Sequence, residues 1–372
     1  MRILVVTPFF YPHVGGSQSY MEDLYAYVLS SHKDVRVDVL CYNTLGSPKT
    51  QTYKRIRIIR ISCWNILTDQ FCIPHPFELI SFLFSHRSSY DLIHASTRFF
   101  DSSLWTPLWA KIIGVPCILT DHCVGHPIHK NLLIGHIATL IDNTLVRVSL
   151  QAYDRVFATS KAAQSFLKKT FGINAKVHYA GVDTTFFTPS EKRTSRKIRV
   201  VYAGRMIGSK GVEELFETAK KMPFLQWIFV GPGTLEKQLQ RRVQNEDLNH
   251  IRIRGEVDKR TLARILSCSD IFVHPSFHHE GFPGILLEAG ASKLAVIATD
   301  VGGSKEIVIP NKTGILIPPK DQDALQKAVM HLVGNKMLRK NLATALYNHV
   351  RKHFDVKKTS EQFIAPLLPA RQ

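Results

Sequence analysis

Apolar runs and amphipathic stretches alternate along the first 180 residues. The run "RILVVT" at 2–7, rich in β-branched residues and followed by Pro8, is typical of a strand that is buried on both faces. Apolar residues at helical spacing follow up to about residue 31, and further strand-like runs occupy 35–42, 55–61, 91–96, 116–122 and 155–160. Strands that alternate with helical segments predict a parallel, doubly wound sheet.

The alternation stops at 181–197, where the polar and basic stretch "GVDTTFFTPSEKRTSRK" predicts a linker. A second alternating series occupies 198–354, and the whole chain of 372 residues is long enough for two cores. We therefore expect an α/β protein of two Rossmann-like, doubly wound domains, 1–180 and 198–354. Such domains bind ligands at the carboxyl ends of their strands, so the two are expected to face a central cleft.

One apolar stretch, 132–150, approaches the length of a membrane span. Asp142 and Arg147 interrupt it, so we interpret it as a buried helix of the first domain.

The chain carries a formal charge of +18, which suits nucleic acid, an anionic membrane or phosphorylated substrates. It contains neither a zinc-finger nor an RRM signature, so no nucleic-acid partner is expected. Six cysteines without a CxxC pair indicate reduced, mostly buried thiols and a cytoplasmic protein.

The segment "AGRMIGSKG" at 203–211 ends a predicted strand and precedes a predicted helix. Arg205 and Lys210 would lie near the helix N-terminus, where backbone N–H groups and the helix dipole already favour anions. Two cations there suit a diphosphate, although a solvated basic loop would give the same pattern.

The segment "HHEGFPGILLE" at 278–288 combines two acids with a glycine-rich helix entry. Gly281 and Gly284 allow a ligand to approach the backbone, and the N–H groups of Gly284 and Ile285 are available for an oxyanion. Glu280 in the loop and Glu288 in the first turns of the helix can accept hydrogen bonds from sugar hydroxyls. Read singly, each could instead be an ordinary surface acid.

Neither a metal site nor a redox site is expected. HExxH is absent, and Asp321 of the triplet Asp321–Asp323 is better placed to cap a helix than to hold a metal ion. A nucleotide-dependent oxidoreductase would need GxGxxG after the first strand of a domain, and neither domain has it. His122, which follows a strand in "LTDH", is a candidate base or hydrogen-bond donor, or a structural histidine.

These segments together resemble the retaining glycosyltransferases of family 4, which have the two-domain GT-B fold. The resemblance covers nearly the whole chain and is most specific at "EGFPGILLE". It implies that Arg205 and Lys210 bind the donor diphosphate and that Glu288 holds the ribose hydroxyls. It places Glu280 and His122 at the donor sugar, Gly15 and Gly16 beside the phosphates, and Gly281, Phe282, Gly284 and Ile285 in the donor loop.

The resemblance implies a metal-independent transferase without a cofactor. It would transfer a sugar from a UDP-, GDP- or similar nucleotide sugar to a glycan or lipid-linked acceptor bound by the first domain, in cell-surface glycan, polysaccharide or glycolipid synthesis. It also implies that the last helix, from about 355, packs back on the first domain. Alternatives are a sugar-nucleotide-binding protein with little turnover, or another GT-B enzyme such as an epimerase or phosphorylase.

One turn departs from the family pattern. The family usually continues "EAMACGLPVI", whereas this chain has "EAGASKLAVI", with Gly290 for Met, Lys293 for Gly and Ala295 for Pro.

We also expect peripheral contact with an anionic membrane at its cytoplasmic face. The apolar helical candidate 77–87 would supply the buried area. Basic residues of the first domain would supply the charge, namely Lys54, Arg55, Arg57, Arg60, Lys161, Lys168 and Lys169.

Overall fold

The computed structural model describes residues 1–67, 71–127, 131–190, 197–278 and 280–368. It separates into two compact units. The first comprises Met1–Ala180 together with the chain from Lys357 onward, and the second comprises Gly181–Val356. Part of the predicted linker, 191–196, lies outside the described residues.

The first unit is built on an eight-stranded sheet with the order β10-β9-β8-β7-β1-β2-β4-β3. All neighbouring strands are parallel except β3, which runs antiparallel to β4. The strands are β1 (Arg2–Val6), β2 (Arg36–Tyr42), β3 (Thr50–Tyr53), β4 (Ile56–Ile61), β7 (Leu92–Ser96), β8 (Cys117–Asp121), β9 (Arg155–Ala158) and β10 (Lys176–Val177). A separate antiparallel hairpin, which the sequence pattern did not predict, joins β5 (Cys63–Leu67) to β6 (Phe71–Pro74).

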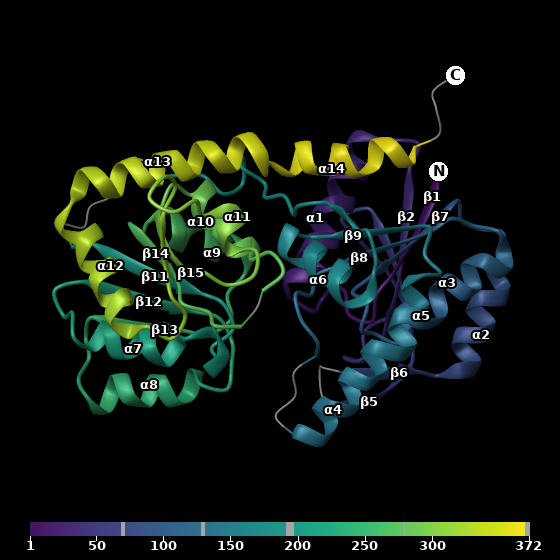
Figure 1. Ribbon diagram of the computed structural model, residues 1–372, viewed down its shortest axis with the longest axis horizontal. Coiled ribbons are helices and arrows are strands. Elements are labelled where there is room, and N and C mark those ends of the chain that lie inside the picture. The colour runs from purple at the N-terminus through teal and green to yellow at the C-terminus, as the bar shows by residue number, and fades with distance from the viewer. Residues whose placement is uncertain (68–70, 128–130, 191–196, 279, 369–372) are drawn as a thin grey trace. The chain divides into compact units, whose positions relative to one another are not determined.

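Helices cover both faces of this sheet (Figure 1). They are α1 (Gly16–Ser31), α2 (Pro76–Ser85), α3 (Ser102–Ile113), α4 (Leu132–Ile141), the π-helix η1 (Asp142–Val146), α5 (Arg147–Leu150), α6 (Lys161–Phe171), α14 (Val356–Ile364) and the 3-10 turn η3 (Ala365–Leu367). Buried residues of α2, α3, α5 and α6 share one core, whereas α1 and α14 contribute to the core on the other face. The sheet is thus doubly wound, as predicted.

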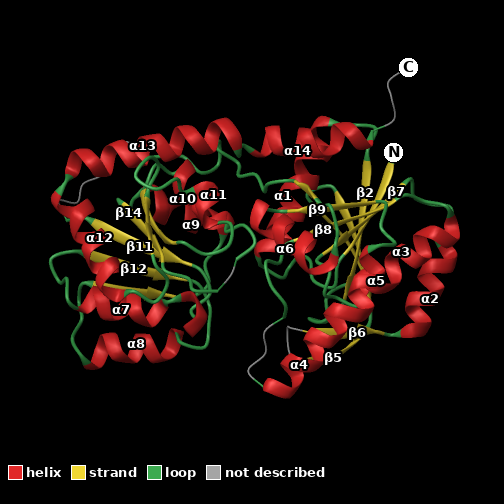
Figure 2. Ribbon diagram, viewed as in Figure 1, coloured by secondary structure: helices red, strands yellow, loops and turns green. Residues whose placement is uncertain are grey.

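The second unit has a six-stranded, fully parallel sheet with the order β13-β12-β11-β14-β15-β16. Figure 2 shows its strands β11, β12 and β14 among the helices of this unit. The strands are β11 (Arg199–Ala203), β12 (Gln226–Val230), β13 (Ile251–Arg254), β14 (Ile271–His274), β15 (Ala295–Thr299) and β16 (Ile315–Ile317). The helices are η2 (Gly208–Lys210), α7 (Val212–Lys220), α8 (Glu236–Asn245), α9 (Lys259–Ser267), α10 (Gly284–Ala291), α11 (Ser304–Ile307), α12 (Gln322–Gly334) and α13 (Lys336–His353).

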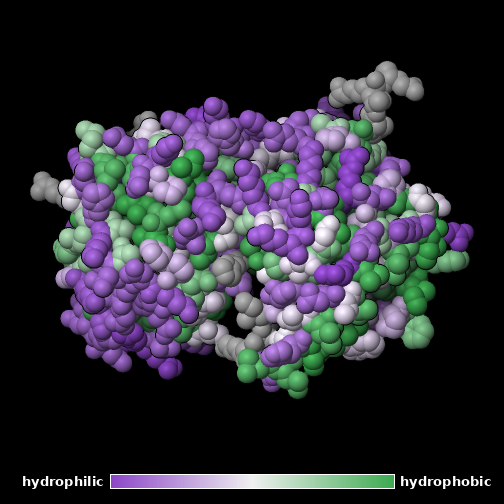
Figure 3. Space-filling model, viewed as in Figure 1, coloured by the Kyte–Doolittle hydropathy of each residue, from purple (hydrophilic) through white to green (hydrophobic). Residues whose placement is uncertain are grey.

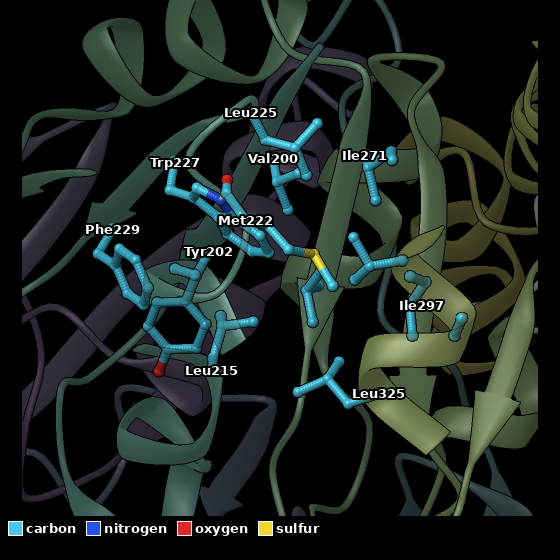
Figure 4. Close-up of a cluster of buried hydrophobic side chains, with 14 of the residues drawn as sticks. Val200, Tyr202, Leu215, Met222, Leu225, Trp227, Phe229, Ile271, Ile297 and Leu325 are labelled. Carbon is cyan, nitrogen blue, oxygen red and sulfur yellow. Dashed lines mark hydrogen bonds between the residues drawn. The ribbon is translucent and has the colours of Figure 1, made fainter. Parts of the chain in front are cut away.

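The central strands of both sheets are buried because helices lie against the two faces of each sheet. In β1 every residue after Arg2 is buried, and in β15 every residue is buried, as their apolar runs predicted. Figure 4 shows the centre of the second core, where Trp227, Phe229 and Tyr202 pack beside Met222 and Leu215. Continuous apolar strands between amphipathic helices therefore fix the two sheets.

The described part of the predicted linker packs on the second unit instead of forming a free tether. Val182 and Phe187 are buried, and the carboxylate of Asp183 accepts hydrogen bonds from the backbone N–H groups of Thr185 and Phe186. The two apolar side chains explain why this polar stretch is ordered.

The interpretation of 132–150 as a buried helix is wrong. None of the residues of α4 is buried, and Leu132 and Leu133 are 77% and 69% exposed. The stretch is the one helix among the described residues that is long and apolar enough to cross a membrane by length and composition, and only 11% of it is buried. The interpretation took the whole stretch as one environment. The carboxylate of Asp142 is buried, but the helical turns before it are exposed.

A buried ion cluster fixes the C-terminal half of this stretch to the sheet. Arg98, directly after β7, donates from Nη1 to Asp121 at 2.6 Å and from Nη2 to Asp142 at 3.2 Å. The three side chains are at most 1% exposed, and the guanidinium lies 4.9 Å from the ring of Phe166 and 5.3 Å from that of Phe171. We call this group the Arg98 cluster.

Candidate functional site

Four loops meet at the carboxyl ends of the strands in the second unit, where the doubly wound topology predicts a ligand site. Backbone hydrogen bonds join the loop after β11 to those after β12 and β14, through Met206 N to Pro232 O at 2.7 Å and Phe277 N to Ser209 O at 3.1 Å. The loop after β15 joins through Gly303 N, which donates to Glu280 O at 3.0 Å. The loops therefore form one connected rim.

Glu280 is the centre of this rim. Its Oε1 accepts from Lys210 Nζ at 2.8 Å and lies 2.8 Å from His274 Nε2. Burial alone would raise the pKa of Glu280, but His274 and Lys210 outweigh it and hold that pKa well below the usual range. Glu280 is consequently an anion at neutral pH. We call Glu280, Lys210 and His274 the Glu280 corner.

Arg205 adds a second cation near this corner. Its side chain is exposed, and its carbonyl oxygen accepts from the hydroxyl of Tyr202 at 2.8 Å. Burial, with a contribution from Glu280, raises the pKa of Tyr202, and the charge of Arg205 opposes that rise. Lys210 and Glu280 are thus in direct contact, and Arg205 lies close enough to Tyr202 for its charge to act there.

Gly302 makes the close packing around Glu280 possible. It has a φ of +51°, and a Cβ at this position would lie 1.9 Å from the carbonyl oxygen of Glu280. Only glycine fits both the backbone angle and the space. The paired glycines after β15 therefore support the Glu280 loop from the side.

Helix α10 directs its N-terminus to the same rim. No side chain caps this end, which begins at Gly284, and the first N–H groups of a helix have no partner within the helix. Glu288 follows one turn later and is half-buried. Ahead of the helix, Gly281 is buried and the ring of Phe282 contacts that of Phe354 at 5.5 Å. Glu288, Gly284 and Ile285 thus share one short helix whose start adjoins Glu280.

Two of the predicted glycines have no packing reason to be glycine. A Cβ at Gly16 or at Gly284 would meet no atom within 4 Å, and neither residue has a positive φ. Gly15, by contrast, is the extended N-cap of α1, and a Cβ there would meet the side chain of Gln18 at 2.4 Å.

The predicted site residues of the first unit lie at its own strand ends. His122 follows β8, with its Nε2 3.5 Å from the hydroxyl of Ser96 and its ring edge-on to that of Tyr20 at 4.9 Å. Burial lowers the pKa of His122 to about 3, so the imidazole is neutral at pH 7. A neutral His122 can accept or donate one hydrogen bond but carries no charge to a ligand.

The sequence reasoning missed His274 and Tyr20. His274 is the last residue of the apolar strand β14, and a polar residue at the carboxyl end of such a strand is the signal that could have identified it. Tyr20 lies on the buried face of α1, where its hydroxyl is 2.6 Å from His178 Nδ1. Its aromatic spacing resembles that of a core residue, so the sequence gives no such signal for it.

The acidic triplet near α12 has the capping role that was predicted. Asp321 is the N-cap of α12, and its Oδ1 accepts from the backbone N–H of Ala324 at 2.8 Å. Within the described residues, no group of three or more His, Cys, Asp or Glu side chains could hold a metal ion.

Comparison with known proteins covers both units. Residues 14–186 match the family model described as Glycosyltransferase Family 4, and residues 183–349 match the model described as Glycosyl transferases group 1. An uncharacterised glycosyltransferase of Methanocaldococcus jannaschii is 22% identical, with 98% of this chain and 97% of the relative covered.

Two solved structures share the fold. Sucrose-phosphate synthase from Thermosynechococcus elongatus superimposes with a TM-score of 0.81 at 21% identity, covering 98% of both chains. HepE of Anabaena, solved with UDP, has a TM-score of 0.79 at 20% identity and covers 99% of both chains. At these identities the likeness establishes a shared fold.

Proposed function

Because the chain belongs to the group 1, or family 4, glycosyltransferases, whose GT-B fold it shares, we propose that it transfers a sugar from a nucleotide-diphosphate sugar with retention of anomeric configuration. The observation that carries this proposal is the Glu280 corner, in which an ionised acid and a lysine lie on the rim that also holds the N-terminus of α10.

The proposed donor diphosphate would lie near Arg205 and Lys210, because both belong to the loop after β11 and Lys210 contacts Glu280 in the loop that leads to the uncapped start of α10. A departing nucleoside diphosphate gains negative charge as the glycosidic bond breaks, and fixed cations at that point lower the barrier. Glu288 would accept hydrogen bonds from the ribose hydroxyls. The lack of a packing reason for glycine at Gly16 and Gly284 supports close approach of a ligand at both positions.

Retention by a covalent double displacement is less favoured than attack on the donor face from which the diphosphate departs. Retaining glycosidases use two carboxylates about 5 Å apart. Glu280 is already engaged by Lys210 and His274, so its role would be to orient the sugar rather than to attack it. We propose that His122, being neutral, donates or accepts a hydrogen bond at the transferred sugar.

The second candidate function is a sugar-nucleotide-binding protein with little turnover, which the altered turn at 290–295 could favour. In the structure this turn closes with hydrogen bonds from Lys293 N to Gly290 O at 2.9 Å and from Leu294 N to Ala289 O at 3.1 Å. Lys293 adopts a φ of +61°, so the turn keeps a left-handed residue without glycine. The backbone behind α10 is therefore regular, which supports the catalytic alternative.

We further propose that the enzyme is cytoplasmic, acts in cell-surface glycan or glycolipid synthesis, requires no metal and contacts the membrane. Of the basic residues expected to make that contact, Arg60 is buried and donates to the carbonyls of Tyr11 and Pro48. Lys54 is paired with Glu22. These two cations are engaged within the protein, so the proposed membrane contact requires other residues.

Thermal unfolding with a panel of sugar nucleotides tests donor binding. A donor at 100 times its Kd should stabilise the protein by about 2.7 kcal/mol. The selected donor is then incubated with cell-envelope lipid and glycan acceptors in excess EDTA, and NMR reports the anomeric configuration of the product. Selective binding without turnover would favour the binding protein, an inverted product would refute retention, and activity restored only by Mg²⁺ or Mn²⁺ would refute metal independence.

A further inference from the structure

Helix α4 is predominantly apolar and yet exposed. Its sequence "LLIGHIATLI" contains no charged residue, and none of its residues is buried. Leu132, Leu133, Ile137 and Leu140 are between 50% and 77% exposed. A helix that is apolar all round is normally buried in a protein or in lipid, so water alone is a poor environment for α4.

Polar side chains of α4 and of the adjoining η1 make hydrogen bonds to the backbone of the same stretch. His136 Nδ1 lies 2.7 Å from Leu132 O, and Thr139 Oγ1 donates to Gly135 O at 2.9 Å. Asn143 Nδ2 and Thr144 Oγ1 donate to the carbonyls of Thr139 and Leu140 at 3.0 and 2.7 Å. Groups whose hydrogen bonds are made within the helix need no water, which is the condition that hydrocarbon imposes.

The apolar surface continues over the neighbouring helices. Leu145 and Val148 are exposed on η1 and α5, and Leu108 and Ile112 are exposed on α3, which contacts α5. Since α3 and α5 pack on the same core, their outer faces look away from the sheet on one side.

Helix α2 also exposes apolar side chains on its outer face, and it packs on the same core as α3 and α5. Phe77, Ile80 and Phe84 are 87%, 61% and 69% exposed, and Ser85 Oγ donates to Ser81 O at 2.7 Å. Figure 3 shows apolar residues gathered over the α2, α3 and α4 side of the first unit. We call the exposed apolar residues of α2 to α5 the apolar flank.

The exposed charged residues that border the apolar flank are positive. Lys111 and Arg147 are exposed on α3 and α5, and Arg87 lies just after α2, 4.6 Å from the ring of Phe84. The acids of these helices are engaged, since Asp142 is buried on Arg98 and Glu78 is paired with Lys49. Apolar insertion bordered by cations complements an anionic lipid surface.

The stretch 132–150 is too firmly attached to cross a bilayer. Asp142 belongs to the Arg98 cluster, and Val146 and Leu150 lie in the core, so only α4 and the outer face beyond it are available. The ten residues of α4 span about 15 Å, half of the hydrocarbon thickness of about 30 Å. One leaflet is therefore the depth that α4 can reach.

We propose that the apolar flank inserts into a single anionic leaflet, with α4 as the deepest element. The helix follows β8 and His122 in the chain, so the inserted surface begins close in sequence to the acceptor side of the proposed transferase. The inference that the acceptor is presented by this leaflet rests on that proposed function. The insertion itself rests on the flank.

Sedimentation with vesicles tests the insertion. The whole protein should bind vesicles of phosphatidylglycerol and phosphatidylcholine at 0.15 M salt, and pure phosphatidylcholine vesicles more weakly. The double variant Leu133→Asp/Ile137→Asp should bind the anionic vesicles at least tenfold less. The matched control Phe224→Asp/Met337→Asp changes two exposed apolar residues of the second unit and should bind like the wild type.

Three further readouts decide between explanations. Equal thermal unfolding of both variants excludes misfolding, and a failure of the wild-type protein to bind anionic vesicles overturns the proposal. If sedimentation velocity shows a wild-type dimer that Leu133→Asp/Ile137→Asp dissociates, a second copy covers the flank and the proposal is wrong. Hydrolysis of UDP-glucose, UDP-N-acetylglucosamine or GDP-mannose should be the same in wild type and double variant. Absence of hydrolysis in both proteins, with vesicle binding intact, would count against the transferase and leave the insertion standing.

Discussion

The Arg98 cluster and the Glu280 corner are both buried ionic groups, but they differ in balance and in access. Arg98 serves two carboxylates, and its cluster is at most 1% exposed. Glu280 is a single carboxylate that serves Lys210 and His274, and Glu280 and Lys210 keep 14% and 13% of their side-chain surface. A closed group holds elements together, whereas a slightly open one can exchange a partner for a ligand.

The largest expected effect is on stability and comes from the closed group. Arg98→Met would leave the buried Asp121 without its cation and Asp142 with only His126 Nδ1, 2.7 Å from its Oδ2, and breaking such a group costs about 3–5 kcal/mol. Urea unfolding should show this loss, while Arg36→Met, an exposed arginine at the start of β2, should change stability by less than about 0.5 kcal/mol. Equal stability of Arg98→Met would show that the cluster is not a structural clamp.

Substitutions at the Glu280 corner should lower the turnover number. Lys210→Ala is expected to lower kcat by about 10²-fold or more, because it removes a fixed cation from the leaving diphosphate. Arg205→Ala should act in the same direction. Lys220→Ala, which removes a surface partner of Glu246, is the control. Near-normal rates in both site variants would place the diphosphate elsewhere.

A smaller effect is expected one helix turn away from the corner. Glu288→Ala should weaken donor binding by about 1.5–3 kcal/mol if the acid accepts bonds from ribose hydroxyls. Isothermal titration with the selected donor measures it, with Glu213→Ala on the exposed first turn of α7 as control. Unchanged affinity would remove Glu288 from the site.

The smallest effect concerns the support behind α10. Lys293 has a φ of +61°, which costs a side-chain-bearing residue about 1 kcal/mol. Lys293→Gly should therefore stabilise the second unit by about 0.5–1 kcal/mol. Lys340→Gly within α13 should destabilise it by a similar amount. Destabilisation by both substitutions would mean that the contact of Lys293 with the ring of Tyr347 outweighs the backbone strain.

The sequence predicted the sheets because strands buried on both faces, such as 2–7, leave continuous apolar runs. It predicted that the loops of Lys210 and Glu280 lie side by side because the carboxyl ends of parallel strands share an edge. It could not predict the pairing of Glu280 with His274, since that depends on which way a strand-end side chain turns.

The error at 132–150 has a different origin. Hydrophobic content is similar for a helix packed against a sheet and for a helix that faces lipid. The two differ in whether other elements of the protein cover the helix, which its own sequence does not show. The buried Asp142 and the exposed Leu140 lie two positions apart, so the averaged pattern conceals the change of environment. Gly290 likewise has its reason in a tertiary contact, since a Cβ there would meet Val350 of α13 at 2.8 Å.

The helix α14 also imposes an order on biosynthesis. Its Phe363 and Ile364 are buried with α1 and β1, and the carbonyl of Thr359 lies 2.8 Å from His178 Nε2. During translation, residues 1–180 emerge from the ribosome before Thr359, Phe363 and Ile364 have been synthesised. The first unit must therefore wait, with Tyr25 and Leu92 incompletely covered, until the whole second unit has been translated.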